Sequence, residues 1–128
     1  DQYKQFALPA IARICDELHT YAPITVFAKD AFFVRQELSQ LKCNTIGLDW
    51  TMDISESRKL IGNNKTLQGN ADPCLLYADF DTIKKETEKM LRAFGPDRHI
   101  ANLGHGLYPD LEKEKVKFFV DVVKNFRF

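Results

Sequence analysis

The sequence lacks the short motifs by which many enzymes bind nucleotides, bind catalytic zinc or build a serine nucleophile. Its 128 residues contain no GxGxxG, GxxxxGK[ST], HExxH or GxSxG pattern. The histidines have no shared spacing and no group of four ligands is available for structural zinc, so we expect neither a metal nor a cofactor. The residues concerned are His19, His99 and His105.

Cysteine is scarce, and charge of either sign is not in excess. Three widely spaced cysteines form no CxxC pair, which argues against a disulfide framework and favours a reducing compartment. Eighteen basic residues balance eighteen acidic ones, so no net charge favours nucleic acid or a membrane surface as a partner. No apolar run approaches the roughly 20 residues that span a bilayer.

The N-terminal stretch DQYKQFALPA has neither an initiator Met nor the pattern of a signal peptide. It resembles the middle of a helix. We therefore expect the chain to be a segment of a longer protein.

Helix-type and strand-type patterns alternate along the chain. Apolar spacing predicts helices over 4–18, 31–41, 54–61 and 81–94, a short helix after Asp72-Pro73, and a last helix from Asp110 with Val116, Phe119, Val120 and Val123 as its apolar stripe. Strands are expected over 24–28, 45–50, 65–71 and 99–104. Asp53 or Ser55 is a plausible N-cap of 54–61, and Gly62 its C-terminal glycine.

This order predicts an α/β fold with a parallel sheet. The strands are short, apolar and not alternating, as expected when both faces are covered. Four strand–helix units fit either a small open sheet with helices on both faces or half of an eight-unit barrel. Periodicity does not choose between them.

Each predicted strand ends abruptly in polar residues: Lys29-Asp30, Asp49-Trp50-Thr51, Asn70 with Asp72, and His105. The carboxyl ends of parallel strands carry the chemistry in α/β folds, because the loops there meet at one mouth. The simpler interpretation is that Asp49 caps a turn and that Lys29 and Asp30 form a surface ion pair, which contributes little.

His105 lies between two glycines in NLGHGLYPD. Gly104 and Gly106 let backbone approach a ligand closely and allow positive φ. Imidazole can bind a carboxylate or exchange a proton near neutral pH. The alternative is a ring that only satisfies loop carbonyls.

The segments FAKD, GLDWT, LQGNADPCLLYA and FGPDRHIANLGHGLYPD, with the closing FVDVV helix, resemble the C-terminal third of the uroporphyrinogen decarboxylase family, in the same order. The resemblance covers nearly the whole chain from about Pro23. It implies that residues 1–128 are the C-terminal half-barrel, about four βα units, of a single-domain TIM (β/α)8 barrel. The segment FAKDAFF resembles the cytosolic rather than the plastid members of this family.

The resemblance implies decarboxylation of the four acetate side chains of uroporphyrinogen to coproporphyrinogen, without cofactor or metal, by a homodimer in haem biosynthesis. His105 corresponds to the family's active-site histidine, with a catalytic or substrate-binding role. The family's arginine-rich N-terminal segment has no counterpart here, nor do the aspartate, tyrosine and serine that meet the substrate. We therefore expect the chain alone to be inactive.

Two alternatives accompany this interpretation. Related methyltransferases hold zinc with a His-x-Cys pair and a later Cys, which would fall near Phe27, Lys29 and His105; only His105 could be a ligand, so the sequence argues against that branch. The other is a non-catalytic half-barrel acting as an assembly module or persisting as a remnant. A half-barrel exposes two sheet edges, so we expect the isolated segment to self-associate.

Overall fold

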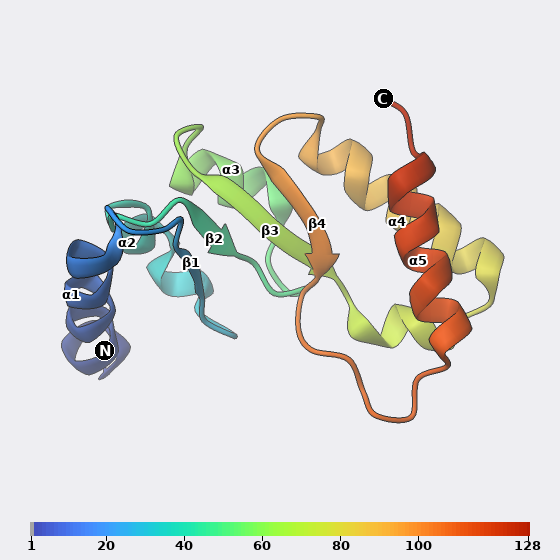
Figure 1. Ribbon diagram of the computed structural model, residues 1–128, viewed down its shortest axis with the longest axis horizontal. Helices are drawn as coiled ribbons and strands as arrows, with labels where there is room; N and C mark the ends of the chain where they lie inside the picture. Colours follow the sequence, from blue (N-terminus) through green and yellow to red (C-terminus); the bar gives the residue numbers. More distant parts are fainter. Residues whose placement is uncertain (1) are drawn as a thin grey trace.

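The computed structural model describes residues 2–128, which form one parallel sheet and its connecting helices (Figure 1). In chain order the elements are a π-helical turn η1 (Tyr3–Ala7), α1 (Leu8–Leu18), β1 (Thr25–Phe27), a 3-10 turn η2 (Phe32–Val34), α2 (Arg35–Ser39), β2 (Thr45–Gly47), α3 (Ile54–Ile61), β3 (Thr66–Ala71), a 3-10 helix η3 (Pro73–Tyr77), α4 (Phe80–Phe94), β4 (His99–Leu103) and α5 (Lys113–Asn125). Every predicted strand is present, and each predicted helix has a helical segment at its place in the chain.

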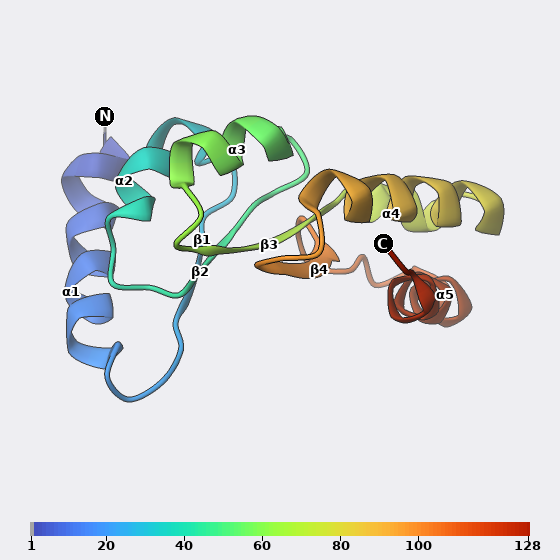
Figure 2. The same cartoon turned by 90° about the horizontal axis from the view of Figure 1, so that it is seen from above.

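The strands pair in sequential order, β1-β2-β3-β4, and all pairs are parallel. Helical segments follow each strand. Helices α2, α3 and α4 lie on one side of the sheet, α1 lies beyond its β1 end, and α5 lies beside β4 (Figure 2). A doubly wound sheet reverses its strand order and carries helices on both faces, whereas a barrel keeps sequential order. The chain is therefore an α/β protein with the topology of a partial (β/α)8 barrel.

The core lies between the sheet and the helices on its covered side. Val26, Ile46 and Leu67 follow one another across β1, β2 and β3 in register, and all three are buried. Helix α4 contacts β3 and turns its apolar stripe inward, with Ile83, Thr87, Met90, Leu91 and Phe94 all buried. Burial of this stripe explains why α4 forms as one uninterrupted helix.

No helix of residues 2–128 covers the other face of the sheet (Figure 2). In β1, Thr25 and Phe27 are exposed on either side of the buried Val26, and Phe27 and Ile100 each keep 44% of their surface exposed. The expectation that both faces are covered is wrong for this chain, because the helices lie on one side only. We call the uncovered side the open face.

The predicted caps of two helical segments are confirmed. The Asp53 carboxylate accepts a hydrogen bond from the Glu56 N–H at 2.7 Å, and the Asp72 carboxylate accepts one from the Cys74 N–H at 2.8 Å. Gly62 ends α3 with φ of 85°, a conformation that favours glycine. Each cap satisfies a backbone donor that the first turn leaves unpaired.

Two predicted helices differ in the structure. Residues 31–41 form a 3-10 turn and the short α2 instead of one helix. The last helix begins at Lys113 rather than at Asp110, because the Asp110 carboxylate accepts a hydrogen bond from the Tyr77 hydroxyl at 2.7 Å and caps no helix.

The apolar stripe of α5 is narrower than predicted. Phe119 is buried and Val120 is 41% exposed, because α5 packs on α4 and η3 with one side and leaves the other to solvent. Within residues 2–128 no helix has the length and apolarity needed to cross a bilayer.

Candidate active-site edge

The loops that follow β1 and β2 and the end of β3 meet at one residue, Asp49, at the carboxyl edge of the sheet. Asp49 is fully buried; its Oδ2 accepts the Asp30 N–H at 2.7 Å, and its Oδ1 accepts the Thr51 N–H at 2.8 Å and the Thr51 hydroxyl at 2.5 Å. The Asn70 Nδ2 donates to the Asp49 carbonyl oxygen at 3.0 Å. Asp49 therefore caps its turn, as the simpler interpretation held, and it also joins its own loop to the loop after β1 and to strand β3.

The Asp49 carboxyl is held in its ionised form. Burial raises its pKa, but the hydrogen bonds from the Thr51 side chain, from the Asp30 N–H and from the Thr51 N–H, with the Lys29 charge, outweigh burial and bring the pKa below its usual value. Four favourable interactions with the anion thus exceed the cost of removing it from water.

Gly104 brings the loop after β4 against the same point. A Cβ on Gly104 would lie 2.4 Å from the backbone nitrogen of Trp50, so only glycine permits this backbone contact. The positive-φ glycines are Gly62, Gly69 and Gly95, and a Cβ on Gly106 would meet no atom within 4 Å. The expectation that the two glycines flanking His105 supply positive φ is wrong, and the space at Gly104 is filled by backbone.

His105 lies exposed at this edge and contacts two aromatic rings. Its ring centroid is 6.2 Å from that of Phe27 and 6.3 Å from that of Trp50, both in edge-on arrangements. The Lys29 Nζ lies 5.2 Å from the Trp50 ring centroid and 2.8 Å from the Asp30 carboxylate. The side chains of Phe27, Lys29, Trp50 and His105 are called the edge cluster below.

Phe27 is the member of the edge cluster that the sequence did not single out. Register explains its place: Phe27 pairs with Gly47, and a Cβ on Gly47 would lie 2.8 Å from the Phe27 Cδ2. The ring can lie over β2 because glycine stands there. The sequence signal that could have predicted the place of Phe27 was an aromatic residue at the last position of one strand, opposite a glycine on the next.

The other histidines lie elsewhere. His99 begins β4, as predicted; its ring stacks on Phe94 at 3.7 Å, and its Nε2 donates to the Gly69 carbonyl oxygen at 2.8 Å. Burial lowers the pKa of His99. His19 follows α1, where its Nδ1 lies 2.9 Å from the Asp16 carbonyl oxygen. Within residues 2–128, no three side chains among His, Cys, Asp and Glu are grouped as metal ligands.

The edge cluster combines an imidazole, an ammonium group and two aromatic rings. Imidazole and ammonium donate hydrogen bonds to carboxylates, and the rings offer flat apolar surface. Such a set suits an aromatic or heteroaromatic ligand that carries acidic groups. The strand ends predicted to gather at one edge are therefore brought together there, with His105 on the side of the open face.

Comparison with known proteins identifies the family of the chain. The family model described as uroporphyrinogen decarboxylase (URO-D) matches residues 1–126. Uroporphyrinogen decarboxylase from Ovis aries is 44% identical over 129 residues, and that from Salinibacter ruber is 40% identical over 126 residues. These alignments cover 94% and 96% of this chain but 35% and 36% of the relatives. The chain thus spans about a third of their length.

A solved structure supports the fold. A methyltransferase from Methanosarcina mazei superposes with a TM-score of 0.82 over 98% of this chain and 37% of its own, at 19% sequence identity. At that identity the likeness concerns the fold alone. The family match covers almost the entire chain, and relatives from an animal and a bacterium carry the same name. The chain belongs to the uroporphyrinogen decarboxylase family.

Proposed function

We propose that the chain is the C-terminal half-barrel of an enzyme that decarboxylates the acetate side chains of uroporphyrinogen to give coproporphyrinogen, and that it forms one wall of the active-site mouth. The observation that carries this proposal is the contact of His105 with Phe27 and Trp50 at the carboxyl edge of the sheet, in a chain of this family. In this proposal the complete enzyme is a cytoplasmic homodimer in haem biosynthesis. Residues 1–128 are then a segment of its single barrel domain and not a domain of their own.

The edge cluster fits a tetrapyrrole that carries carboxylates. Phe27 and Trp50 offer ring surface to the pyrroles. His105 and Lys29 supply N–H donors on the same side, and the Trp50 ring holds the Lys29 ammonium by a cation–π contact. The Asp30 carboxylate also forms an ion pair with the Lys29 ammonium. An incoming substrate carboxylate therefore competes with an exposed ion pair, which costs little to break.

The reaction needs a proton at each arm. Protonation of the pyrrole carbon beside the arm creates an electron sink, and the C–CO₂ bond then breaks, with its electron pair passing into the ring. A proton on the former acetate carbon completes the methyl group, and the ring loses the proton it gained. Each turn converts R–CH₂–COO⁻ and H⁺ to R–CH₃ and CO₂. In this proposal His105 binds the departing carboxylate or transfers one of these protons.

The cations needed for a substrate with many carboxylates are not at this edge. Lys29 is in the edge cluster, but the arginines belong to helices or their flanks: Arg13, Arg35, Arg58, Arg92, Arg98 and Arg127. Arg35 is buried and donates to Phe32, Ser57 and Glu56. Arg58 and Arg98 meet at the amino edge, where Arg58 donates to the Arg98 carbonyl oxygen. We therefore expect the 128-residue chain alone to lack decarboxylase activity.

A complementation assay tests the function. Uroporphyrinogen is incubated with the chain by itself, and with the chain co-expressed with the N-terminal two thirds of the Ovis aries relative. The oxidised porphyrin products are separated by chromatography and detected by their fluorescence. We expect coproporphyrin only from the co-expressed pair. Turnover by the chain alone would contradict the need for the second segment. A pair that co-purifies without turnover would overturn the decarboxylase assignment.

The open face favours a second candidate, a non-catalytic assembly module. Phe27 and Ile100 are large apolar side chains, each 44% exposed on that face, and β1 and β4 each have one unpaired edge. Exposed edges and apolar faces favour pairing with another chain. Co-purification without catalysis in the assay above is the result that this candidate predicts.

A further inference from the structure

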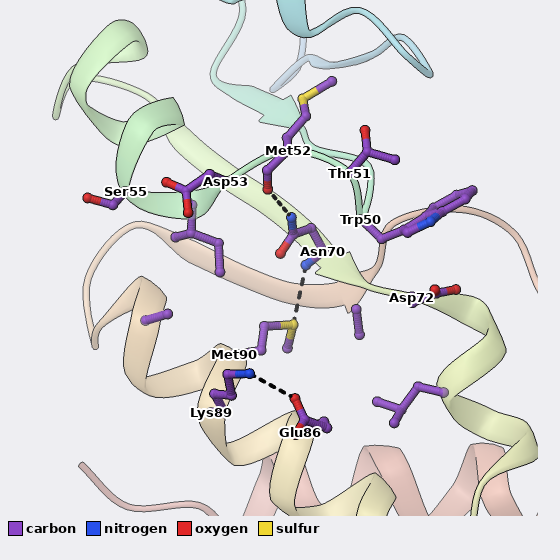
Figure 3. Close-up of a pocket in the computed structure, with 14 residues that line it drawn as sticks. Trp50, Thr51, Met52, Asp53, Ser55, Asn70, Asp72, Glu86, Lys89 and Met90 are labelled. Carbon is purple, nitrogen blue, oxygen red and sulfur yellow. Dashed lines mark hydrogen bonds and ion pairs between the residues drawn. The ribbon is translucent and has the colours of Figure 1, made fainter.

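A cavity on the helix-covered side of the sheet has no role in the proposed function. It lies between the start of α3, the end of β3, η3 and α4, and its volume is about 740 Å³ (Figure 3). Small-molecule sites usually measure about 300–1,000 Å³. Trp50 and Thr51 form one end, but Phe27, Lys29 and His105 do not line it.

The cavity has an apolar floor and a rim rich in carboxylates. Ile54, Ala71, Leu75, Met90 and Ala93 contribute apolar surface. The charged side chains of the rim are Asp53, Asp72, Glu86 and Lys89. Lys89 pairs with Glu86 at 3.2 Å, so the rim keeps an excess of negative charge. This sign is the opposite of what an acidic tetrapyrrole requires.

A buried amide points an acceptor into this space. Asn70 is 8% exposed, and its Nδ2 donates to the Asp49 and Met52 carbonyl oxygens at 3.0 and 2.8 Å. These two bonds fix the amide so that its Oδ1 is directed away from the β2–α3 loop, toward the space beside Met90 (Figure 3). Within residues 2–128 no donor is hydrogen-bonded to this oxygen. This oxygen is not among the side-chain atoms that are both fully buried and unpartnered, so it stays accessible at the cavity wall, where the N–H of a ligand can donate to it.

The polar groups offered here to a ligand are mostly acceptors. Asn70 Oδ1 lies deep, and the rim carboxylates of Asp53 and Asp72 each use one oxygen to cap a helical segment. A ligand must then bring N–H donors, positive charge and a small apolar body. We infer that this cavity binds a small primary ammonium compound, with its charged nitrogen directed to Asn70 and the rim carboxylates. The inference is independent of the decarboxylase proposal.

Three probes of one shape test this site on the 128-residue chain. Cyclohexylammonium, cyclohexanol and cyclohexanecarboxylate are titrated separately, and backbone amide shifts are followed by NMR. We expect cyclohexylammonium to bind about two- to fivefold more tightly than cyclohexanol, since one exposed charge pair contributes up to about fivefold. The shifts should concentrate at 50–55, 70–75 and 86–93. Equal binding of the neutral probe, preference for the anion, no binding, or shifts elsewhere would each overturn the proposal.

Paired variants on α4 locate the binding. Ala93→Leu fills the cavity and should weaken cyclohexylammonium binding at least tenfold, whereas Lys85→Leu, at an exposed position of the same helix outside the lining, should not. Glu86→Gln should weaken it about two- to fivefold, with Glu88→Gln as the matched control. Leucine and glutamine are good helix formers, so all four variants are expected to fold. Unchanged affinity in Ala93→Leu would show that the probe binds elsewhere.

Discussion

His105 is the residue on which the proposed chemistry depends. Its ring is exposed and touches Phe27 and Trp50 edge-on, which leaves its nitrogens accessible from the open face. The motif NLGHGLYPD predicted its position at a strand end. Its two aromatic neighbours come from β1 and from the loop after β2, and only the parallel pairing of the strands brings them to it.

Replacing His105 tests its role in the complemented enzyme. We expect His105→Asn to lower turnover at least tenfold or to release partly decarboxylated intermediates, because general acid–base groups contribute about 10²- to 10⁴-fold. The measurement is kcat with the distribution of products by carboxyl number. His19→Asn, on the flank of α1, is the matched control. Unchanged kinetics in His105→Asn would leave the ring with a structural role only.

Tyr77 and Asp110 form a second residue-scale feature. The hydrogen bond from the Tyr77 hydroxyl to the Asp110 carboxylate raises the pKa of Tyr77 to about 12. It joins η3 to the loop that carries His105. Tyr108 of that loop lies beside Tyr77, with ring centroids 6.2 Å apart.

Removing the Asp110 charge should lower the Tyr77 pKa from about 12 toward its usual 10.0. The raised value means that this bond stabilises the fold below pH 10 and that its contribution is lost as pH rises through 12. Ring-proton NMR on Asp110→Asn measures the shift. A Tyr77 pKa that stays near 12 in this variant would rule out Asp110 as its cause.

At the scale of elements, Asp49 holds the carboxyl edge together. The loop after β1, its own loop and strand β3 are hydrogen-bonded to this one residue, and the backbone of the loop after β4 packs on it at Gly104. The Asp30 backbone has a φ of 58°, uncommon outside glycine, and the bond from its N–H to Asp49 helps to fix that conformation. Lys29, the preceding residue, is thereby placed over Trp50.

Asp49→Asn should destabilise the chain by about 1–3 kcal/mol, because the donors of Asp30 and Thr51 lose a charged acceptor. The pKa of Asp49 is lowered in the fold, so its contribution is present above its ordinary value of 3.8 and is lost as pH falls below it. Urea unfolding at pH 7 and at pH 3 measures both effects. The gap between variant and parent should shrink at the lower pH, and an equal gap at both would argue against an ionised Asp49.

For the whole molecule, the open face determines how the chain behaves by itself. Helices cover one side of the sheet, and the other presents Thr25, Phe27, Ile100 and Asn102 to solvent. Apolar side chains in the middle of a sheet face are normally covered. The chain spans about 35% of its relatives, which fits a face completed by other strands in their longer chains.

The isolated chain should therefore self-associate through the open face. Ile100→Thr removes apolar surface from that face and should raise the monomer fraction measured by light scattering. Leu60→Thr, at a 39% exposed position of α3, should leave association unchanged. A parent chain that runs as a clean monomer would contradict the prediction.

The sequence by itself determined the elements, their order and the family. Apolar spacing defined α4, Asp53 and Gly62 marked the ends of α3, and the motif around His105 carried the resemblance, because these signals are local in the chain. Only the tertiary structure decided the rest. Strand order and the side on which the helices lie chose the barrel topology, and long-range contacts placed Phe27 beside His105, made Gly104 a packing requirement and moved Asp110 from a helix cap to a partner of Tyr77. Such contacts join residues far apart in sequence, so no local pattern contains them.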